Sequence, residues 1–333
     1  MKSTAIANSN IAIIKYWGKR DEKLNLPTNS SISFTMDEQL STVTTVEFDS
    51  SLTNDSVHLD KMPAGEKETL RVTKFLDLVR QMANIKTKAR VSSVNSFPRG
   101  VGLASSASGF AALAGAASKA AGLNLSNKEL STLARQGSGS ASRSILGGCV
   151  EWQMGKKPDG SDSYAKQILN EEKCADIRNV IVILETREKK VSSRDGMRET
   201  VATSTLYKQR MKDVKERTKN IKIALANSDM QKIYKIIMED SSSMHATMLD
   251  TFPPIFYLNE ISKEIIEKVN EINAKYGKLV CGHTFDAGPN GNVYTTKEYS
   301  EEIAKEMKQI KGVQKVMESI VGQGLKFSEK HLF

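Results

Sequence analysis

The chain has 333 residues, of which 39% are hydrophobic and 26% charged, and its formal net charge at pH 7 is +9. This composition suits a well-buried core, and the length favours two domains over one. No stretch is long and apolar enough to span a bilayer and residues 1–6 begin no apolar signal segment, so we expect a cytoplasmic protein with no membrane partner.

Charge and cysteine content narrow the class further. The lysines are spread along the chain and mixed with acidic residues, as in residues 188–190 and 212–217, which is typical of solvated helix faces. We therefore expect no nucleic-acid partner and interpret the positive charge as attraction of highly anionic small substrates. The three widely spaced cysteines form neither a metal pattern nor a disulfide framework and indicate a reducing compartment: Cys149, Cys174 and Cys281.

The first half of the chain alternates strand and helix patterns. Alternation of apolar and polar residues, or short apolar runs, predicts strands over residues 11–14, 42–48 and 88–94. Residues 68–84 form an amphipathic helix pattern whose apolar face is Val72, Phe75, Leu76, Val79 and Ala83. A second helix is predicted over residues 127–136. The polar, glycine-containing residues 155–163 predict a turn or surface loop.

The second half opens on residues 180–184, which are apolar on both faces, as a central strand is. Long helical patterns follow through residues 199–275, with a break at Pro253 and Pro254. A strand is expected around residues 279–285. The two halves together indicate an α+β protein.

A glycine-rich turn, PRGVGLASSAS over residues 98–108, is the most informative single motif. Gly100 and Gly102 let the backbone approach a ligand closely, and Ser105 or Ser106 is predicted to cap the helix that follows. The unpaired N–H groups and the dipole at such a helix start favour a phosphate. The motif has no Walker A lysine and lacks dinucleotide-fingerprint spacing. An ordinary loop before a buried small-residue helix remains the alternative.

Three further clusters carry possible ligand-binding groups. Residues 10–21 end an apolar strand in Lys15, Tyr16, Lys19 and Arg20, and two of these cations, Lys19 and Arg20, can pair with phosphoryl oxygens. The alternative there is an exposed basic strand end with Trp17 in the core. Residues 137–144 place four serines around Arg143, which can bind a carboxylate or phosphate, unless the segment is a flexible linker. Asp286 ends a strand before a tight turn, which is also common turn chemistry.

Together these motifs, in this order, resemble the mevalonate diphosphate decarboxylases of the GHMP kinase superfamily over essentially the whole chain. The matching segments are NIAIIKYWGK at 10–19, LPTNSS at 26–31, the glycine-rich turn, GSGSASR at 137–143, SRDGM at 193–197, MHAT at 244–247 and residues 285–290. The resemblance implies a ribosomal protein S5 domain 2-like N-terminal domain over residues 1–177. It also implies a ferredoxin-like C-terminal domain over residues 178–333, with the site between the two.

The resemblance implies ATP-dependent decarboxylation of (R)-5-diphosphomevalonate to isopentenyl diphosphate, with ADP, phosphate and carbon dioxide as the other products. ATP phosphorylates the tertiary 3-hydroxyl, and departure of that phosphate draws the electrons of the breaking C–C bond into the alkene, so no pyridoxal or thiamine cofactor is needed. The implied cofactors are ATP and Mg²⁺. A homodimer is expected from the family alone.

The resemblance also assigns roles to residues. Asp286 would accept or orient the 3-hydroxyl proton, Lys15 would lie beside it, and Arg143 would bind the substrate carboxylate. The implied substrate-binding set is Asn10, Tyr16, Trp17, Gly18, Lys19, Arg71, Ser138, Gly139, Ser140, Ala141, Ser142, Arg143, Arg194 and Met197. The implied nucleotide-binding set is Ser93, Gly102, Leu103, Ala104, Ser105, Ser106, Ala107 and Ser108. Mg²⁺ would be held mainly by phosphate oxygens, with Ser106 as its protein contact.

One position departs from the family pattern and keeps alternatives open. Arg99 stands where these decarboxylases usually have threonine, either as a loop residue or as the mark of a changed substrate. A sister decarboxylase acting on mevalonate 5-phosphate, or on mevalonate 3,5-bisphosphate without ATP, is the second hypothesis. A non-catalytic anion- or RNA-binding module is the third, and Asp286 and Arg143 argue against it. His245 and His283 are interpreted as packing residues.

Overall fold

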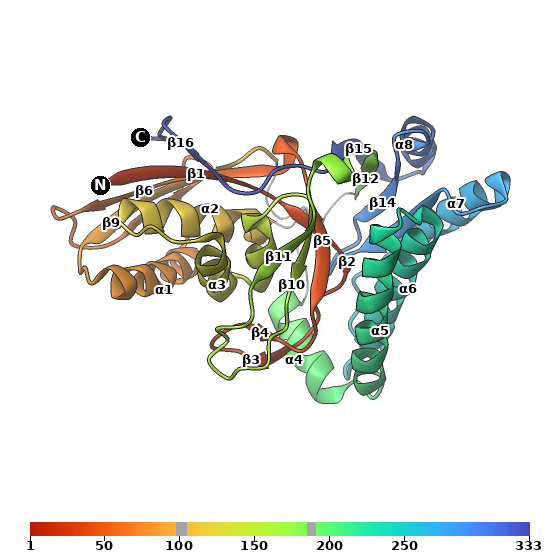
Figure 1. Cartoon of the computed structure of the whole chain (residues 1–333), viewed down its shortest axis with the longest axis horizontal. Helices are drawn as coiled ribbons and strands as arrows, with labels where there is room; N and C mark the ends of the chain where they lie inside the picture. Colours follow the sequence, from red (N-terminus) through yellow and green to blue (C-terminus); the bar gives the residue numbers. More distant parts are fainter. Residues whose placement is uncertain (98–104, 185–190) are drawn as a thin grey trace.

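A six-stranded sheet and three helices build the N-terminal half in the computed structural model, which describes residues 1–97, 105–184 and 191–333 (Figure 1). The sheet order is β16-β1-β6-β9-β7-β8. Its strands are β1 (Lys2–Asn8), β6 (Ser41–Asp49), β7 (Ser56–Leu59), β8 (Met62–Pro63), β9 (Lys88–Asn95) and β16 (Lys326–Ser328). The helices on it are α1 (Glu66–Ala83), α2 (Ser105–Ala120) and α3 (Asn127–Gly137).

The helices of this half follow from their sequences. α1 buries four residues of the predicted face, Val72, Phe75, Leu76 and Val79, whereas Ala83 at the end of the helix is half-buried. α2 is rich in alanine and buried almost all round, so it lies close against β1 and β6. α3 begins at a capping box in which Ser126 and Glu129 exchange hydrogen bonds. One apolar core joins all three helices to the sheet.

A second sheet, ordered β11-β10-β5-β2, connects the two halves. Its strands are β2 (Asn10–Ile14), β5 (Ser31–Thr35), β10 (Cys149–Trp152) and β11 (Ala165–Leu169). Ile11 and Ile13 of β2 share a core with Ile221 of α5 (Tyr207–Ala226) and Ile236 of α6 (Met230–Leu249). The hydroxyl of Tyr294 donates to the carbonyl of Ile11 at 3.1 Å. The end of β2 is therefore fixed against the C-terminal half.

The C-terminal half is a sheet ordered β13-β14-β12-β15 with helices on both faces (Figure 1). Its strands are β12 (Ile177–Leu184), β13 (Cys281–Phe285), β14 (Gly291–Thr296) and β15 (Val313–Ile320). Its helices are α4 (Ser193–Thr203), α5 (Tyr207–Ala226), α6 (Met230–Leu249), α7 (Glu260–Tyr276) and α8 (Ser300–Gln309). Val180 and Val182 face the core under α7 and α8, whereas Ile181 and Ile183 face the core shared with β2.

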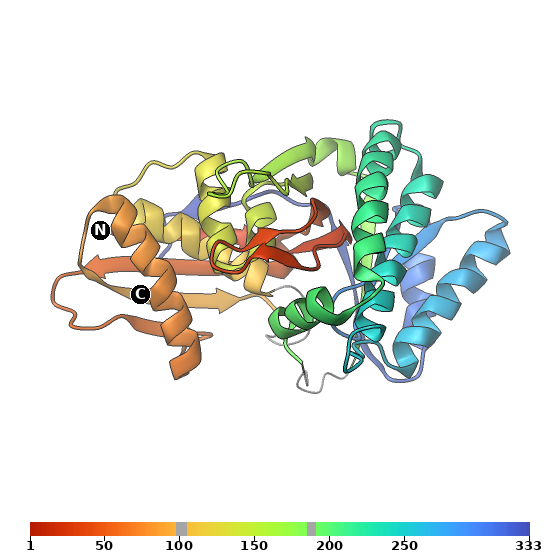
Figure 2. The same ribbon diagram turned by 90° about the horizontal axis from the view of Figure 1, so that it is seen from below.

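Short elements complete the chain between these layers. β3 (Lys19–Asp21) and β4 (Leu26–Pro27) form a two-stranded ribbon after β2. The 3₁₀ turns among the described residues are η1 (Glu38–Leu40), η2 (Gly139–Ile145) and η3 (Glu172–Cys174). α4 contacts both α6 and β3 and so lies where the two halves meet (Figure 2).

One prediction about these elements is corrected. Ser105 and Ser106 lie inside the first turn of α2 rather than at an N-cap. The last strand of the chain, β16, pairs antiparallel with β1 and so lies in the first sheet. The predicted strands and helices outside these positions are found within a few residues of their expected ends.

Candidate active site

An ion pair between Lys15 and Asp286 lies where the two halves meet. Lys15 directly follows β2 and Asp286 directly follows β13, so each charged side chain stands at a strand end. Lys15 Nζ donates to Asp286 Oδ1 at 2.6 Å. The lysine side chain is 2% exposed, whereas the carboxylate is 35% exposed. The carboxylate is thus held by a buried cation and is itself partly exposed.

Arg143 lies in η2, buried beside this pair. Its Nε donates to Asn10 Oδ1 at 3.0 Å and to Ser33 Oγ at 2.9 Å, and its Nη1 donates to Ser31 Oγ at 2.5 Å. Burial lowers the pKa of the guanidinium to about 10, and the charge of Asp286 opposes that shift. Arg143 therefore stays cationic at neutral pH.

The sequence suggested that the neighbouring serines of residues 137–144 surround the Arg143 guanidinium. In the structure, Ser142 and Ser144 bind elsewhere. Ser142 Oγ donates to the Gly139 carbonyl at 2.8 Å, and Ser144 Oγ accepts from Asn10 Nδ2 at 2.8 Å. Both side chains are buried, as is Ala141. The 3₁₀ turn directs them into the fold, and β5 supplies the hydroxyls for Arg143 instead.

Two guanidiniums converge on the Gly137 carbonyl. Arg71 Nη2 donates to it at 2.9 Å and Arg194 Nη2 at 3.2 Å. Burial, and next the charge of Arg194, lower the pKa of Arg71 to about 10. A Cβ on Gly137 would lie 2.0 Å from the Phe110 ring, so only glycine fits. The Arg71 guanidinium also lies 4.3 Å from the centre of the Phe110 ring. Two neighbouring cations, Arg71 and Arg194, favour the binding of an anion.

The segment after β2 lines the same region. The Tyr16 hydroxyl is buried and has no hydrogen-bond partner among the described residues. Burial, and next the charge of Glu22, raise its pKa, while Arg194 and Arg143 oppose that shift. Lys19 Nζ donates to Glu22 Oε2 at 2.7 Å. The Tyr16 hydroxyl is therefore neutral and can donate a hydrogen bond near Arg143 and Arg194.

Trp17, Gly18 and Met197 shape the wall rather than supply polar contacts. Trp17 is 2% exposed and packs edge-on against Tyr257, in a cluster that also contains Met197. Gly18 adopts φ +109°, and a Cβ there would lie 1.9 Å from the Tyr207 hydroxyl oxygen. That hydroxyl donates to the Trp17 carbonyl at 3.0 Å.

Serine hydroxyls link this region to the start of α2. Ser106 Oγ lies 3.4 Å from Ser138 Oγ, which lies 3.4 Å from Ser140 Oγ. The Ser140 carbonyl accepts from Asn10 Nδ2 at 3.0 Å, and Asn10 also holds Arg143. A continuous row of polar groups therefore joins the α2 terminus to the residues beside Asp286.

The predicted nucleotide residues divide into three groups. Ser105 and Ser106 are accessible at the α2 start, whereas Ala107 and Ser108 are buried. Ser108 Oγ accepts from Thr42 Oγ1 at 2.7 Å, and Ser93 Oγ pairs with Thr44 Oγ1 at 2.8 Å. Gly102, Leu103 and Ala104 lie outside the described residues, as does Arg99.

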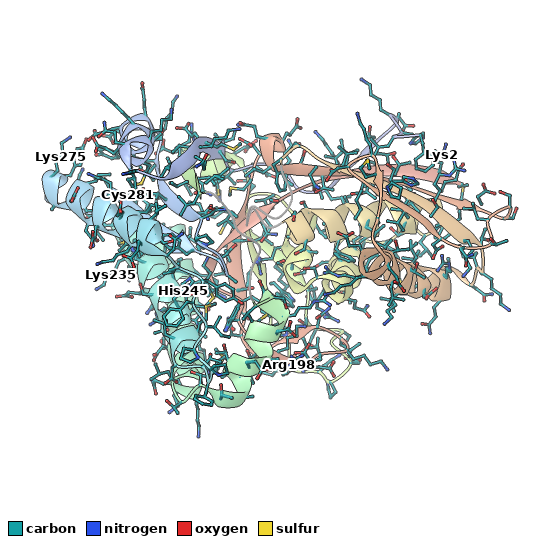
Figure 3. All side chains as sticks on the ribbon, turned by 180° about the vertical axis from the view of Figure 1, so that it is seen from behind. Lys2, Arg198, Lys235, His245, Lys275 and Cys281 are labelled. Atoms are coloured by element: carbon teal, nitrogen blue, oxygen red, sulfur yellow. The ribbon has the colours of Figure 1, made fainter. Side chains whose placement is uncertain are left out.

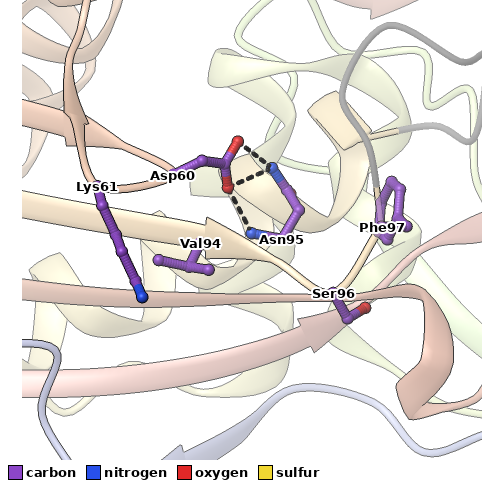
Figure 4. Close-up of a pocket in the computed structure, with 6 residues that line it drawn as sticks. All are labelled: Asp60, Lys61, Val94, Asn95, Ser96 and Phe97. Atoms are coloured by element: carbon purple, nitrogen blue, oxygen red, sulfur yellow. Dashed lines mark hydrogen bonds between the residues drawn. The ribbon is translucent and has the colours of Figure 1, made fainter.

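A pocket of about 400 Å³ lies at the end of β9, immediately before the glycine-rich turn (Figure 4). It is lined by Asp60, Lys61, Val94, Asn95, Ser96 and Phe97. Asp60 Oδ1 accepts from the Asn95 backbone N–H at 2.9 Å, which fixes the pocket wall. The lining of this pocket contains both apolar and polar side chains.

Several site residues were missed from the sequence. Ser31 and Ser33 were not assigned a role at Arg143, although LPTNSS at 26–31 was matched. Asp240 and Ser241 of α6 were also missed, and they contact Lys15 and Phe285. His245, on the same helix, is buried and packs edge-on against Phe285, which confirms its interpretation as a packing residue. Figure 3 labels His245 on that helix. Burial, and next the charge of Lys15, lower the pKa of His245 to about 4, so it is neutral at pH 7.

The described part of the chain shows neither a cluster of metal ligands nor a membrane-spanning helix. Residues 1–97, 105–184 and 191–333 contain no group of three or more His, Cys, Asp or Glu side chains that could hold a metal ion. Within the same ranges, no helix has the length and apolar character to cross a membrane.

Comparison with known proteins gives concordant matches along the whole chain. Residues 7–165 match the diphosphomevalonate decarboxylase-like N-terminal domain, and residues 179–330 match the mevalonate 5-diphosphate decarboxylase C-terminal domain. The diphosphomevalonate decarboxylase of Saccharomyces cerevisiae is 41% identical, over 99% of this chain and 85% of its own length.

Solved structures agree with these matches. The mevalonate diphosphate decarboxylase of Staphylococcus aureus has a TM-score of 0.93 at 37% identity, covering 98% of both chains. A structure of MDDEF in complex with MVAPP, AMPPCP and magnesium has a TM-score of 0.92 at 39% identity, covering 99% of both chains.

Proposed function

The chain belongs to the mevalonate diphosphate decarboxylase family, and we propose that Asp286, Lys15 and Arg143 perform this family's reaction in it. The protein is an ATP-dependent decarboxylase that converts (R)-5-diphosphomevalonate to isopentenyl diphosphate in the mevalonate pathway. The substrate carries a carboxylate, a tertiary hydroxyl and a diphosphate. The single observation that carries the residue assignment is the Lys15–Asp286 pair at the junction of the two halves.

Asp286 acts on the proton of the 3-hydroxyl. Its carboxylate is partly exposed, and Lys15 Nζ holds one of its oxygens at 2.6 Å, so the carboxylate has a fixed orientation. A carboxylate held in this way accepts a proton when the hydroxyl lies within hydrogen-bond distance. The positive charge of Lys15 also offsets the negative charge that ATP and 5-diphosphomevalonate bring to the site.

Arg143 pairs with the substrate carboxylate. Its guanidinium is buried and held by Asn10, Ser31 and Ser33, so little conformational entropy is lost when it binds. The carboxylate is thereby kept in the orientation in which carbon dioxide departs when the phosphorylated oxygen leaves.

The diphosphate binds where Arg71 and Arg194 converge. Two cations share one carbonyl acceptor there, and the Tyr16 hydroxyl has no protein partner among the described residues. A diphosphate supplies both the negative charge and the acceptors that these groups lack. Lys19 and Met197 complete this end, and Ser138, Gly139 and Ser140 contact the mevalonyl part.

ATP binds along the start of α2, with its base toward the pocket at Asn95 and Ser96. Ser105 and Ser106 present hydroxyls and backbone N–H groups at a helix terminus, which suits phosphate oxygens. When bound, Mg²⁺ would neutralise part of the negative charge of the phosphate oxygens. Ser106 fits the role of its protein contact because its exposed hydroxyl faces Ser138 of the substrate region.

We also propose three properties of the whole molecule. A domain boundary near residues 177 and 178 is supported by the two family matches, which leave residues 166–178 between them. A homodimer follows from the family resemblance. A cytoplasmic location is supported by the three unpaired cysteines, all of which are buried.

The test is a matrix of substrates and nucleotide. Purified protein is incubated with mevalonate 5-phosphate, 5-diphosphomevalonate or mevalonate 3,5-bisphosphate, each with and without ATP and Mg²⁺, and carbon dioxide and ADP are recorded. We expect equimolar carbon dioxide and ADP only with 5-diphosphomevalonate and ATP. Release without ATP, or with another substrate alone, would assign the chain to a sister activity instead.

Asp286→Asn is the matched variant for this test. It preserves shape and removes the proton acceptor, so we expect turnover to fall by roughly 10²- to 10⁴-fold. Substrate binding, measured by calorimetry, should change little. Retention of turnover by Asp286→Asn would contradict the role proposed for this carboxylate.

A further inference from the structure

We propose that Asp240 and Ser241, neighbours on α6, are positioning residues that set the Lys15–Asp286 pair. Asp240 Oδ2 accepts from the Lys15 backbone N–H at 2.7 Å. Ser241 Oγ accepts from the backbone N–H of Phe285, the residue before Asp286, at 3.0 Å. One helix therefore holds both chain segments that carry the ion pair. The proposal rests on the role given above to Asp286 and extends it to the residues that fix its place.

Asp240 is anchored by two arginines. It is fully buried, and Arg210 donates from Nη1 to Asp240 Oδ1 and from Nη2 to Asp240 Oδ2, each at 3.3 Å. Arg217 adds a second cation at 3.6 Å. Because both arginines belong to α5, the carboxylate is fixed by the helix pair before it meets β2.

The Asp240 contact also crosses between the halves. β2 belongs to the second sheet of the N-terminal half, whereas α6 packs against β13 of the C-terminal sheet. The 2.7 Å bond to Lys15 is made to its backbone, so it fixes where the lysine side chain starts. The Asn29 side chain holds the Lys15 carbonyl at 3.0 Å, which completes the restraint on this peptide.

Ser241 performs the matching task on the other segment. β13 ends at Phe285, and beyond it the chain turns into Asp286. The Ser241 hydroxyl, 1% exposed, receives the last strand N–H before that turn. His245, one helical turn later, packs edge-on against the Phe285 ring at 6.4 Å. Loss of the serine acceptor would leave the Phe285 N–H buried without this partner and free the strand end to shift.

A shift at either segment changes the distance between two catalytic groups rather than the binding surfaces. The two arginines proposed to bind the diphosphate, Arg71 and Arg194, donate to the Gly137 carbonyl, which belongs to α3. A positioning role therefore predicts a loss in kcat with little change in KM, because misplacement of reacting groups by about 1 Å costs up to 10²-fold. A role in folding alone predicts lower stability with normal kcat.

The experiment compares Ser241→Ala with Ser242→Ala. Ser242 is the next residue on the same helix and is exposed, so the two variants share the gain in helix propensity and differ in the Phe285 contact. We expect Ser241→Ala to lower kcat about tenfold, with KM for 5-diphosphomevalonate and ATP within twofold of wild type. The melting temperature should fall modestly, because a buried N–H loses its acceptor. Ser242→Ala should match wild type. Equal kcat in both variants would overturn the proposal for Ser241.

Asp240→Asn tests the other half of the proposal by an independent readout. The variant keeps one acceptor oxygen but loses the charge that faces Arg210 and Arg217. A structure of the variant, or of Ser241→Ala, should show Lys15 Nζ displaced from Asp286 Oδ1. An unchanged 2.6 Å contact in both variants would overturn the proposal. Turnover by the wild-type protein in the same assays tests the proposed function separately. A failure of the proposed function is therefore distinguishable from a failure of the positioning proposal.

Discussion

Lys15 and Asp286 are 271 residues apart in sequence and 2.6 Å apart in the fold. Their contact could be predicted because each is a charged residue at the end of an apolar strand within a motif of known order. The partners of Arg143 could not, because the 3₁₀ turn that directs Ser142 and Ser144 inward has no distinctive sequence pattern. Asp240 and Ser241 were missed for a similar reason, since they occupy an ordinary helix whose packing only the tertiary structure reveals.

Tyr16→Phe tests the diphosphate end at the residue scale. The hydroxyl is buried without a partner among the described residues, so its removal costs the free protein no hydrogen bond there. We expect KM for 5-diphosphomevalonate to rise roughly tenfold, with kcat nearly unchanged, because one hydrogen bond to a charged ligand is lost. Steady-state kinetics measure both. An unchanged KM would remove the Tyr16 hydroxyl from the substrate site.

At the scale of single elements, periodicity and turn chemistry predicted most of the structure. β12 was expected to be apolar on both faces, and its alternate residues do face two separate cores. The start of α2 was misplaced because Ser105 and Ser106 suit both a cap and a first turn. Short strands such as β3, β4 and β8 were not predicted, since two or three residues carry too weak a pattern.

The turn after β2 allows an element-scale prediction. Gly18→Ala places a Cβ at positive φ and against the Tyr207 hydroxyl, which holds the Trp17 carbonyl. We expect a loss of about 2–3 kcal/mol in the free energy of unfolding. Gly109→Ala in α2 is the control, because a Cβ there meets nothing within 4 Å, and it should gain up to about 1 kcal/mol. Urea titration measures both, and equal effects would contradict the argument.

At the scale of the whole molecule, the sequence indicated two α+β halves but not how they are joined. The core shared by β2, α5 and α6 joins residues far apart along the chain, and neither half alone contains that pattern. The return of β16 to β1 was also not foreseen, because three residues beside an edge strand have no signature of their own. The C-terminal carbonyl of Phe333 accepts from Lys2 Nζ at 3.0 Å, so the chain ends lie together (Figure 1).

Global stability should fall in mild acid because two histidines are buried in the neutral form. Burial lowers the pKa of His245 and of His283 from 6.5 to about 4. The unfolded chain binds these protons below pH 6.5 and the folded chain does not, so the stabilisation is complete above pH 6.5 and declines as the pH falls toward 4. The expected slope reaches about 1.4 kcal/mol per pH unit for each histidine. Urea midpoints that stay constant from pH 7 to pH 5 would contradict this.

A structure of the complex with 5-diphosphomevalonate and a non-hydrolysable ATP analogue would show whether the Asp286 carboxylate contacts the reacting hydroxyl. We predict that an oxygen of Asp286 lies about 3 Å from the substrate 3-hydroxyl, on the side facing the terminal phosphate at the start of α2. A substrate whose 3-hydroxyl lies beyond hydrogen-bond distance of Asp286, with packed side chains between them, would contradict the proposed chemistry.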